Sequence, residues 1–119
     1  MHKFKELNIW KKSIDLTVEI YQLTESYPDN EKFGLISQIR RCSTSIPSNI
    51  AEGSSRLSNK DFARFLQIAL GSAFELETQL TISKRVIKLN ENEIDELIMK
   101  VVEIQKMING FRISIQPNK

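Results

Sequence analysis

Apolar residues recur every three or four positions along nearly the whole chain, which is the spacing of one face of an α-helix. Turn-forming residues interrupt the pattern around positions 27–30, 53–58 and 90–92. The pattern therefore predicts helices over residues 7–26, 31–52, 59–89 and 93–113, and no segment alternates as a half-buried strand would. Connections of about two to six residues favour antiparallel neighbours. We expect an all-α protein, an antiparallel up-down-up-down four-helix bundle in which residues 1–119 form a single domain.

The predicted helix ends carry recognisable capping signals. Ser58 is followed three residues later by Asp61, which is close to a capping box at the start of the third helix. Glu31 lies in the first turn of the second helix, where a negative charge favours the helix dipole. Residues 114–119 follow the last helix and are expected to fray.

The first and third helices carry more apolar positions than one buried face requires. Hydrophobic side chains surround the third helix almost completely, which is typical of a buried helix. The first helix has a main apolar face and a second row well over 100° away. The main face is expected to contain Leu7, Trp10, Ile14, Val18 and Tyr21, and the second row Ile9, Leu16, Ile20 and Leu23. Since a four-helix monomer leaves each helix an outer face, we expect neighbouring copies of the chain to cover the surplus.

The segment 38–56 combines an apolar helical face with a separate polar stripe. Polar side chains of the third helix are expected to meet this stripe in a hydrogen-bond network between helices or subunits, which would fix their register. The predicted network consists of Gln38, Arg41, Ser45, Asn49, Glu52, Glu75 and Gln79. The alternative interpretation is a surface that contacts a ligand or RNA.

Pro47 lies inside this helical pattern. Proline has no backbone N–H, so it is expected to kink or break the helix and to free the carbonyl group of Ser43. We expect the nearby hydroxyl groups of Ser45 and Ser48 to help satisfy the local backbone.

The formal net charge of +2 is small, but the charges are segregated along the chain. Lysines make the start basic, and acidic residues open the last helix. The basic residues in the middle of the chain are our first candidates for phosphate contact: Arg40, Arg41, Arg56, Lys60 and Arg64. A charged row is commonly only a solvated face, yet a symmetric ring would repeat it and strengthen the local field.

The only histidine and the only cysteine limit the chemistry available. His2 is expected to lie in an N-terminal arm outside the bundle, which disfavours a ferritin-like di-iron centre and general-base catalysis by imidazole. Cys42 alone cannot form a structural zinc site or an internal disulfide, so we expect it to be a small packing residue. A cytoplasmic protein is the natural interpretation. No apolar run approaches the ~20 residues that cross a bilayer, so no membrane role is expected.

Three carboxylates, Glu52, Glu75 and Glu77, stand among apolar or small residues. Two such groups brought together can bind Mg²⁺ or share a proton. Pairing with Arg40 or Arg41 is the favoured interpretation, and the chain has no glycine-rich phosphate loop. We therefore expect no metal, no cofactor and no enzyme activity.

Several motifs resemble a known family. The most specific is the run Ser-Ile-Pro-Ser-Asn-Ile-Ala-Glu-Gly at 45–53. The others are Trp10, Tyr27-Pro28, Glu31, Phe33-Gly34-Leu35, Gln38-Ile39-Arg40-Arg41, Phe65-Leu66, Ala69, Gly71-Ser72 and Glu75-Leu76-Glu77-Thr78-Gln79-Leu80. Together they resemble the small bacterial four-helix bundle proteins encoded in the intervening sequences of 23S ribosomal RNA genes.

The resemblance implies a four-helix bundle that assembles into a pentameric ring, without an established enzyme activity. It also implies similarity to the accessory protein of diversity-generating retroelements, whose basic ring binds nucleic acid and a reverse transcriptase. Cys42 and Ser43 stand where the family commonly has small apolar residues, a departure expected to affect packing only.

The leading hypothesis is a cytoplasmic, non-catalytic homo-oligomer, a pentamer by resemblance, that acts as a scaffold associated with RNA or DNA. The rival is a protein-protein interaction module with no nucleic-acid role. An enzyme is the third hypothesis, with Glu52 or Glu75 as the residues to test.

Overall fold

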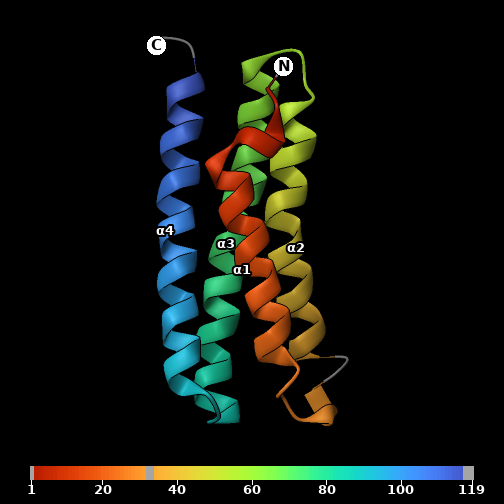
Figure 1. The fold of residues 1–119 in the computed structure, drawn as a ribbon, viewed down its shortest axis with the longest axis vertical. Coiled ribbons are helices and arrows are strands. Elements are labelled where there is room, and N and C mark those ends of the chain that lie inside the picture. Colours follow the sequence, from red (N-terminus) through yellow and green to blue (C-terminus); the bar gives the residue numbers. More distant parts are fainter. Residues whose placement is uncertain (1, 32–33, 117–119) are drawn as a thin grey trace.

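Successive helices run in opposite directions along a bundle that measures 46 × 21 × 20 Å. The structure is a computed structural model that describes residues 2–31 and 34–116. The helices are α1 (Asn8–Thr24), α2 (Leu35–Ser54), α3 (Asn59–Ile87) and α4 (Glu91–Ile115). Two short 3-10 helices, η1 (Phe4–Glu6) and η2 (Asp29–Glu31), precede α1 and α2. The N-terminal segment, the α2–α3 connection and the end of α4 share one end of the bundle (Figure 1). The expected all-α, up-down-up-down architecture is confirmed, with no strand among the described residues.

The second helix begins later than predicted. Its expected start at residue 31 is wrong, because the Glu31 N–H bonds to the Pro28 carbonyl at 3.0 Å and closes a 3-10 turn. Gly34 then has φ −106° and ψ −103°, outside the helical region, so α2 begins at Leu35. Residues 32 and 33, which include Phe33 of the family motif, lie outside the described residues.

The other helix ends also differ from the predicted ones. The first helix is shorter at both ends, and α2 continues two residues past Glu52 to Ser54. Lys88 ends α3 after Ile87 because it adopts a left-handed conformation with φ 59°. The last helix begins at Glu91 and continues to Ile115, so Ser114 is helical rather than frayed. Residues 117–119 lie outside the described part. The predicted cap is correct, since the Ser58 side chain accepts a hydrogen bond from Asp61 N at 3.1 Å.

Side chains from all four helices fill one core along the bundle axis. The helical period predicted the buried face of α2 well, because its apolar residues follow one stripe. Fully buried members are Ile39, Ile46 and Ile50 on α2, Leu66, Leu76 and Leu80 on α3, and Ile94 and Ile108 on α4. In α4, Gln105 is buried as well, and its amide donates to Glu77 Oε1 at 2.7 Å.

The apolar faces of α1 are the reverse of the prediction. The row expected to be secondary is the buried one, and it includes Leu16 and Ile20. Within the predicted main face, Val18 is 52% exposed and Tyr21 is 39% exposed. The buried row also contains Ser13, whose hydroxyl donates to the Trp10 carbonyl at 2.9 Å. Tertiary packing, rather than the number of apolar residues in each row, decides which face is buried.

Pro47 is buried inside α2, and the helix continues through it without a break. The carbonyl of Ser43, four residues earlier, lies 3.0 Å from the Thr17 hydroxyl of α1. The same hydroxyl lies 2.8 Å from the Ser13 carbonyl, so one proton serves both acceptors. The expectation that Ser45 would help satisfy the backbone here is wrong, because its hydroxyl bonds to α3.

Gly53 marks the closest approach of α2 and α3. A Cβ atom at this position would lie 2.6 Å from the Phe65 Cβ and 2.8 Å from the Phe62 Cδ1. Neither distance is tolerated without movement of a helix, because the Phe65 Cβ is attached directly to the backbone. The glycine is therefore required by packing, and it holds together the end of the bundle that carries the basic residues.

Candidate nucleic-acid interface and polar groove

The polar stripe of α2 faces α3 across an open groove. The groove contains a pocket of about 260 Å³ whose lining includes five of the predicted network residues. These are Gln38, Arg41, Ser45, Glu75 and Gln79. A hydrogen bond between the Ser45 and Ser72 hydroxyl groups, at 2.8 Å, crosses the groove directly. The structure therefore brings most of the predicted set together.

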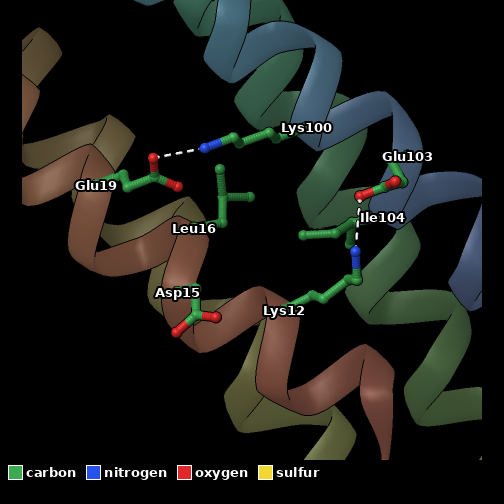
Figure 2. Close-up of a pocket in the computed structure, with 7 residues that line it drawn as sticks. All are labelled: Lys12, Asp15, Leu16, Glu19, Lys100, Glu103 and Ile104. Atoms are coloured by element: carbon green, nitrogen blue, oxygen red, sulfur yellow. Dashed lines mark hydrogen bonds and ion pairs between the residues drawn. The ribbon is translucent and has the colours of Figure 1, made fainter.

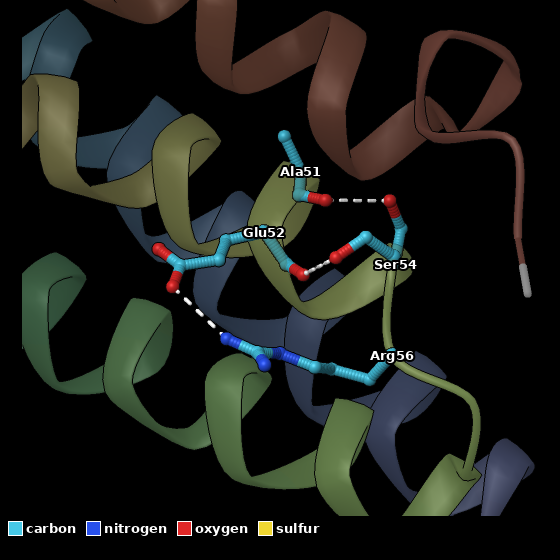
Figure 3. A network of polar contacts seen from close by, with 5 residues as sticks. Ala51, Glu52, Ser54 and Arg56 are labelled. Carbon is cyan, nitrogen blue, oxygen red and sulfur yellow. Dashed lines mark hydrogen bonds and ion pairs between the residues drawn. The ribbon is translucent and has the colours of Figure 1, made fainter.

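Asn49 and Glu52 make contacts within their own chain segment instead. The Asn49 amide donates to the Ser45 carbonyl at 2.8 Å and to the Ser45 hydroxyl at 3.0 Å. Glu52 accepts from the Arg56 guanidinium at 3.1 Å, an ion pair that joins the end of α2 to the following turn (Figure 3). Neither contact crosses to α3.

Cys42 is buried at the base of the groove. Burial raises the pKa of its thiol above the ordinary value, and the negative charge of Glu75 raises that pKa further. A hydrogen bond with Gln79 and the positive charge of Arg41 oppose these effects. A raised pKa keeps the thiol protonated and poorly nucleophilic, which agrees with a packing role.

Glu75 forms no ion pair with Arg40 or Arg41 within the described ranges. The expected pairing is therefore wrong: Arg41 and Glu75 line the same pocket without a direct contact. Both side chains are exposed, and the side-chain oxygen of Gln79 is buried without a hydrogen-bond partner among the described residues. The groove therefore contains polar groups that have no hydrogen-bond or ion-pair partner among the described residues.

Arg40 points away from the groove, toward the end of α1. Its Nε donates to the Thr24 hydroxyl at 2.8 Å, and its terminal nitrogen donates to the Tyr21 carbonyl at 3.3 Å. The guanidinium also lies 4.5 Å from the centre of the Tyr21 ring. The Tyr21 carbonyl also accepts from the Glu25 N–H at 3.2 Å, so Arg40 adds a donor to a carbonyl near the end of α1. Among the candidate phosphate contacts, Arg40 is therefore the one whose donors are already engaged inside the bundle.

The remaining candidates separate into two places. Arg41 lies in the groove, roughly 20 Å along the helix axis from the end of α2 at Ser54. Arg56 lies just beyond that end, with its guanidinium 4.5 Å from the centre of the Phe65 ring. Lys60 and Arg64 follow in the first turns of α3, both exposed, and neither forms an ion pair in the described part of the chain.

The N-terminal segment joins this basic end. The His2 backbone N–H donates to the Ser54 carbonyl at 3.1 Å. The His2 ring packs 5.0 Å from the Phe62 ring and 5.8 Å from the Phe111 ring, so its expected place outside the bundle is wrong. The segment carries Lys3 and Lys5 to the same end, a convergence that the antiparallel topology implies and that the sequence interpretation missed. We name Lys3, Lys5, Arg56, Lys60 and Arg64 the basic end.

A different arrangement occupies the groove between α1 and α4. Lys12 pairs with Glu103 at 3.2 Å, and Lys100 pairs with Glu19 at 2.6 Å, above apolar side chains of both helices (Figure 2). The hydrogen bond to Glu19 raises the pKa of Lys100. Each ion pair joins one helix to the other, so both lysines are neutralised within the chain, whereas Asp15 lines the same pocket without an ion pair among the described residues.

These surfaces define a class of protein: an all-helical bundle with one polar groove and one basic end. Among the described residues, no three His, Cys, Asp or Glu side chains are grouped to hold a metal ion. No described helix is both long and apolar enough to cross a membrane.

A comparison with models of protein families assigns the chain to a known family. Residues 5–110 match the model of the 23S rRNA-intervening sequence protein family, and the chain belongs to this family. The predicted resemblance is confirmed. A crystal structure of a protein of unknown function from the S23 ribosomal protein family of Bacteroides thetaiotaomicron is similar, with 28% sequence identity and a TM-score of 0.78. The similarity covers 87% of this chain and 97% of that chain. None of the curated proteins compared with the chain matches it.

Proposed function

We propose that the protein is a non-catalytic, homo-oligomeric helical scaffold that associates with nucleic acid through its basic end. The observation that supports this function best is that Lys60 and Arg64 are exposed and form no ion pair with any described carboxylate. Arg56, which pairs with Glu52, precedes them in the chain. Cations that no group in the chain neutralises attract phosphate groups and lose affinity for them as salt is added. The family description, which refers to 23S rRNA, favours structured RNA as the first ligand to test.

Self-association is the second part of the proposal. Large apolar side chains of α3 remain between 46% and 59% exposed: Ile68, Phe74, Ile82 and Val86. A second copy of the chain would remove this surface from water at a gain of roughly 25 cal/mol per Å² of apolar area. The number of subunits, five in a ring, comes from the family resemblance. A ring repeats the basic end around its axis and multiplies a small charge per chain.

Binding across a salt series tests the nucleic-acid part. Fluorescence anisotropy would follow a labelled fragment of 23S rRNA and a duplex DNA at several salt concentrations. We expect micromolar affinity or better at low salt and a linear fall of the logarithm of the association constant with the logarithm of salt. Absence of binding at low salt, or binding without a salt slope, would refute the proposed nucleic-acid function.

Light scattering tests assembly, because a 13.8 kDa monomer at tens of micromolar would contradict self-association.

The second candidate function is a protein-protein interaction module, for which a reverse transcriptase is one partner class implied by the resemblance. The observation that favours it is the unused polar capacity of the α2–α3 groove, where Gln79 Oε1 lacks a partner among the described residues. Affinity purification with and without nuclease separates the two functions. A protein partner retained after nuclease treatment, and unaffected by charge reversal at Arg56 and Arg64, would favour this second candidate over the first.

A further inference from the structure

A pocket lies at the basic end, between the N-terminal segment and the last turn of α2. Its volume is about 420 Å³, and its lining includes Lys3, Phe4, Lys5, Ala51 and Ser55. A planar heteroaromatic ring occupies only part of such a volume. The pocket is therefore large enough to admit a single nucleobase.

The wall formed by α2 is fixed and mainly apolar. The Ser54 hydroxyl donates to the Ala51 carbonyl at 2.6 Å, and the Ser55 hydroxyl donates to the Glu52 carbonyl at 2.7 Å (Figure 3). Both hydroxyl protons are used within the chain. The serines therefore present carbon atoms and oxygen lone pairs to the pocket, next to the Ala51 methyl group.

The opposite wall is held in place by contacts on both sides of the pocket. The Phe4 ring packs edge-on against Trp10, with ring centres 5.2 Å apart, and the Leu7 N–H bonds to the Phe4 carbonyl at 3.0 Å. At the other side, the His2 ring nitrogen lies 3.3 Å from Asn59 Oδ1. A pocket held in this way is largely formed before a ligand arrives, which lowers the entropy lost on binding.

Positive charge surrounds this apolar pocket. Lys3 and Lys5 flank Phe4 in the chain, both are exposed, and neither forms an ion pair among the described residues. Arg56 follows directly after Ser55 on the other wall. Glu6 is the one carboxylate in the lining. An apolar slot beside an aromatic ring and two free ammonium groups matches a base with its neighbouring phosphates.

We propose that this pocket, which we name the arm pocket, binds an unpaired nucleobase, with Lys3 and Lys5 at the adjoining phosphates. The inference rests on the proposed nucleic-acid function and specifies its ligand as a single-stranded segment. A base inside a duplex is stacked and paired, so it cannot enter a pocket without being extruded. The arm pocket therefore discriminates against duplex, whereas a purely electrostatic surface would prefer the denser charge of a duplex.

The test compares three labelled probes of about 12 nucleotides, within the usual range of single-strand site sizes. They are a single strand, the duplex of the same sequence and a single strand without bases. We expect the single strand to bind about tenfold more tightly than the strand without bases, because one stacked base contributes about that factor to affinity. Equal affinity for the two single strands, whatever the affinity for the duplex, would overturn the arm pocket while leaving the nucleic-acid function intact, whereas no binding to any probe would overturn both.

Variants assign the effect to the pocket. Phe4→Leu keeps an apolar side chain against Trp10 but removes the ring, so it should lower single-strand affinity about tenfold and leave the strand without bases unaffected. The double change Lys3→Gln and Lys5→Gln should weaken both strands and reduce the salt slope. Its matched control, Arg85→Gln with Lys88→Asn at the opposite end of the bundle, should change neither. Equal losses in the two double variants, each with unchanged circular dichroism, would contradict the proposal.

Discussion

The two lateral grooves of the bundle use charge in opposite ways. Between α1 and α4, Lys12 and Lys100 each pair with a carboxylate of the facing helix. Between α2 and α3, Arg41 and Glu75 line one pocket without a direct pair, and the contacts across the groove are uncharged, such as the hydrogen bonds of Ser45 with Ser72 and of Cys42 with Gln79. Both cations of the first groove are paired within the chain, and Asp15 adds a carboxylate that forms no ion pair among the described residues. The second, with the basic end beyond it, leaves charge and hydrogen-bonding capacity for something outside the chain.

This difference separates charge that supports the fold from charge that is available to a partner. Exposed ion pairs contribute little to stability, typically 0.2–1 kcal/mol, but they neutralise both groups and remove them from competition for a ligand. A cation without a carboxylate nearby keeps its full attraction for phosphate. If the difference holds, substitutions in the packed contacts of α2 should change stability strongly, and substitutions in the α1–α4 ion pairs should change it little.

The largest effect is expected at Gly53. A methyl group there would collide with Phe65 and Phe62, so Gly53→Ala should lower the free energy of unfolding by about 1–3 kcal/mol. Its matched control is Gly110→Ala in α4, where a Cβ meets no atom within 4 Å. That change should raise stability by roughly 0.5–1 kcal/mol, because alanine favours a helix over glycine. Urea unfolding of both variants checks the opposite signs, and equal effects would contradict the close approach of α2 and α3.

The next effect concerns the carbonyl that Pro47 leaves without its helical donor. Thr17→Val removes the hydroxyl that lies 3.0 Å from the Ser43 carbonyl, and should lower stability by about 1–3 kcal/mol because that buried acceptor loses its partner. In a Pro47→Ala background the new backbone N–H can bond to Ser43, so the same change should be less harmful.

A double-mutant cycle read by urea unfolding measures this coupling. Additive effects would show that Thr17 and Pro47 act independently, contrary to the account. The cycle is informative because Thr17 on α1 and Pro47 on α2 report on the contact between these two helices.

The third effect uses Cys42 as a probe of the charges in the polar groove. Removing the nearby negative charge with Glu75→Gln should lower the pKa of the thiol, because Glu75 raises it. Arg41→Gln should raise that pKa, since Arg41 opposes the shift. Below the thiol pKa, the rate of alkylation by iodoacetamide follows the thiolate fraction, so Glu75→Gln should speed the reaction and Arg41→Gln should slow it.

Each change should amount to less than about tenfold, the factor that one pKa unit represents. Rates measured between neutral and alkaline pH give the two thiol pKa values directly. A common direction for both variants would mean that altered access to the buried thiol, rather than charge, controls the rate.

The smallest effect is expected in the α1–α4 groove. Lys12→Gln breaks the ion pair with Glu103, and should lower stability by less than about 1 kcal/mol at low salt. The loss should shrink further at high salt, because the pair is exposed and screened. Urea unfolding at two salt concentrations provides the measurement. A loss in the free energy of unfolding above about 2 kcal/mol, equal at the two salt concentrations, would show that this ion pair is important for holding α1 and α4 together.

The sequence predicted the fold well where one apolar stripe existed and poorly where two competed. On α2, the single row through Ile39, Ile46 and Ile50 left no alternative, and all three are buried. On α1, two apolar rows competed, and the choice depended on contacts with residues far away along the chain, such as the Arg40 guanidinium 4.5 Å from the centre of the Tyr21 ring. No local pattern contains that information.

The candidate site was predictable in part. The helical period placed Gln38, Arg41 and Ser45 on one stripe, and the structure gathers them in one groove. The same period separates Arg40 from Arg41 by 100°, so the sequence alone could have predicted that their side chains point in different directions. His2 was not predictable, because its ring packs against Phe62 and Phe111, which are far away along the chain.

The most direct test of the central claim compares two double variants that lose the same charge from opposite sides of the bundle. Lys60→Gln with Arg64→Gln removes cations without ion pairs in the described chain, whereas Lys12→Gln with Lys100→Gln removes cations that are paired across α1 and α4. The measurement is the salt slope of RNA binding. We predict a slope smaller by about 2 for the first variant, roughly one per lost phosphate contact, and an unchanged slope for the second. Equal slopes in the two variants would contradict the claim that unpaired charge at the basic end binds the nucleic acid.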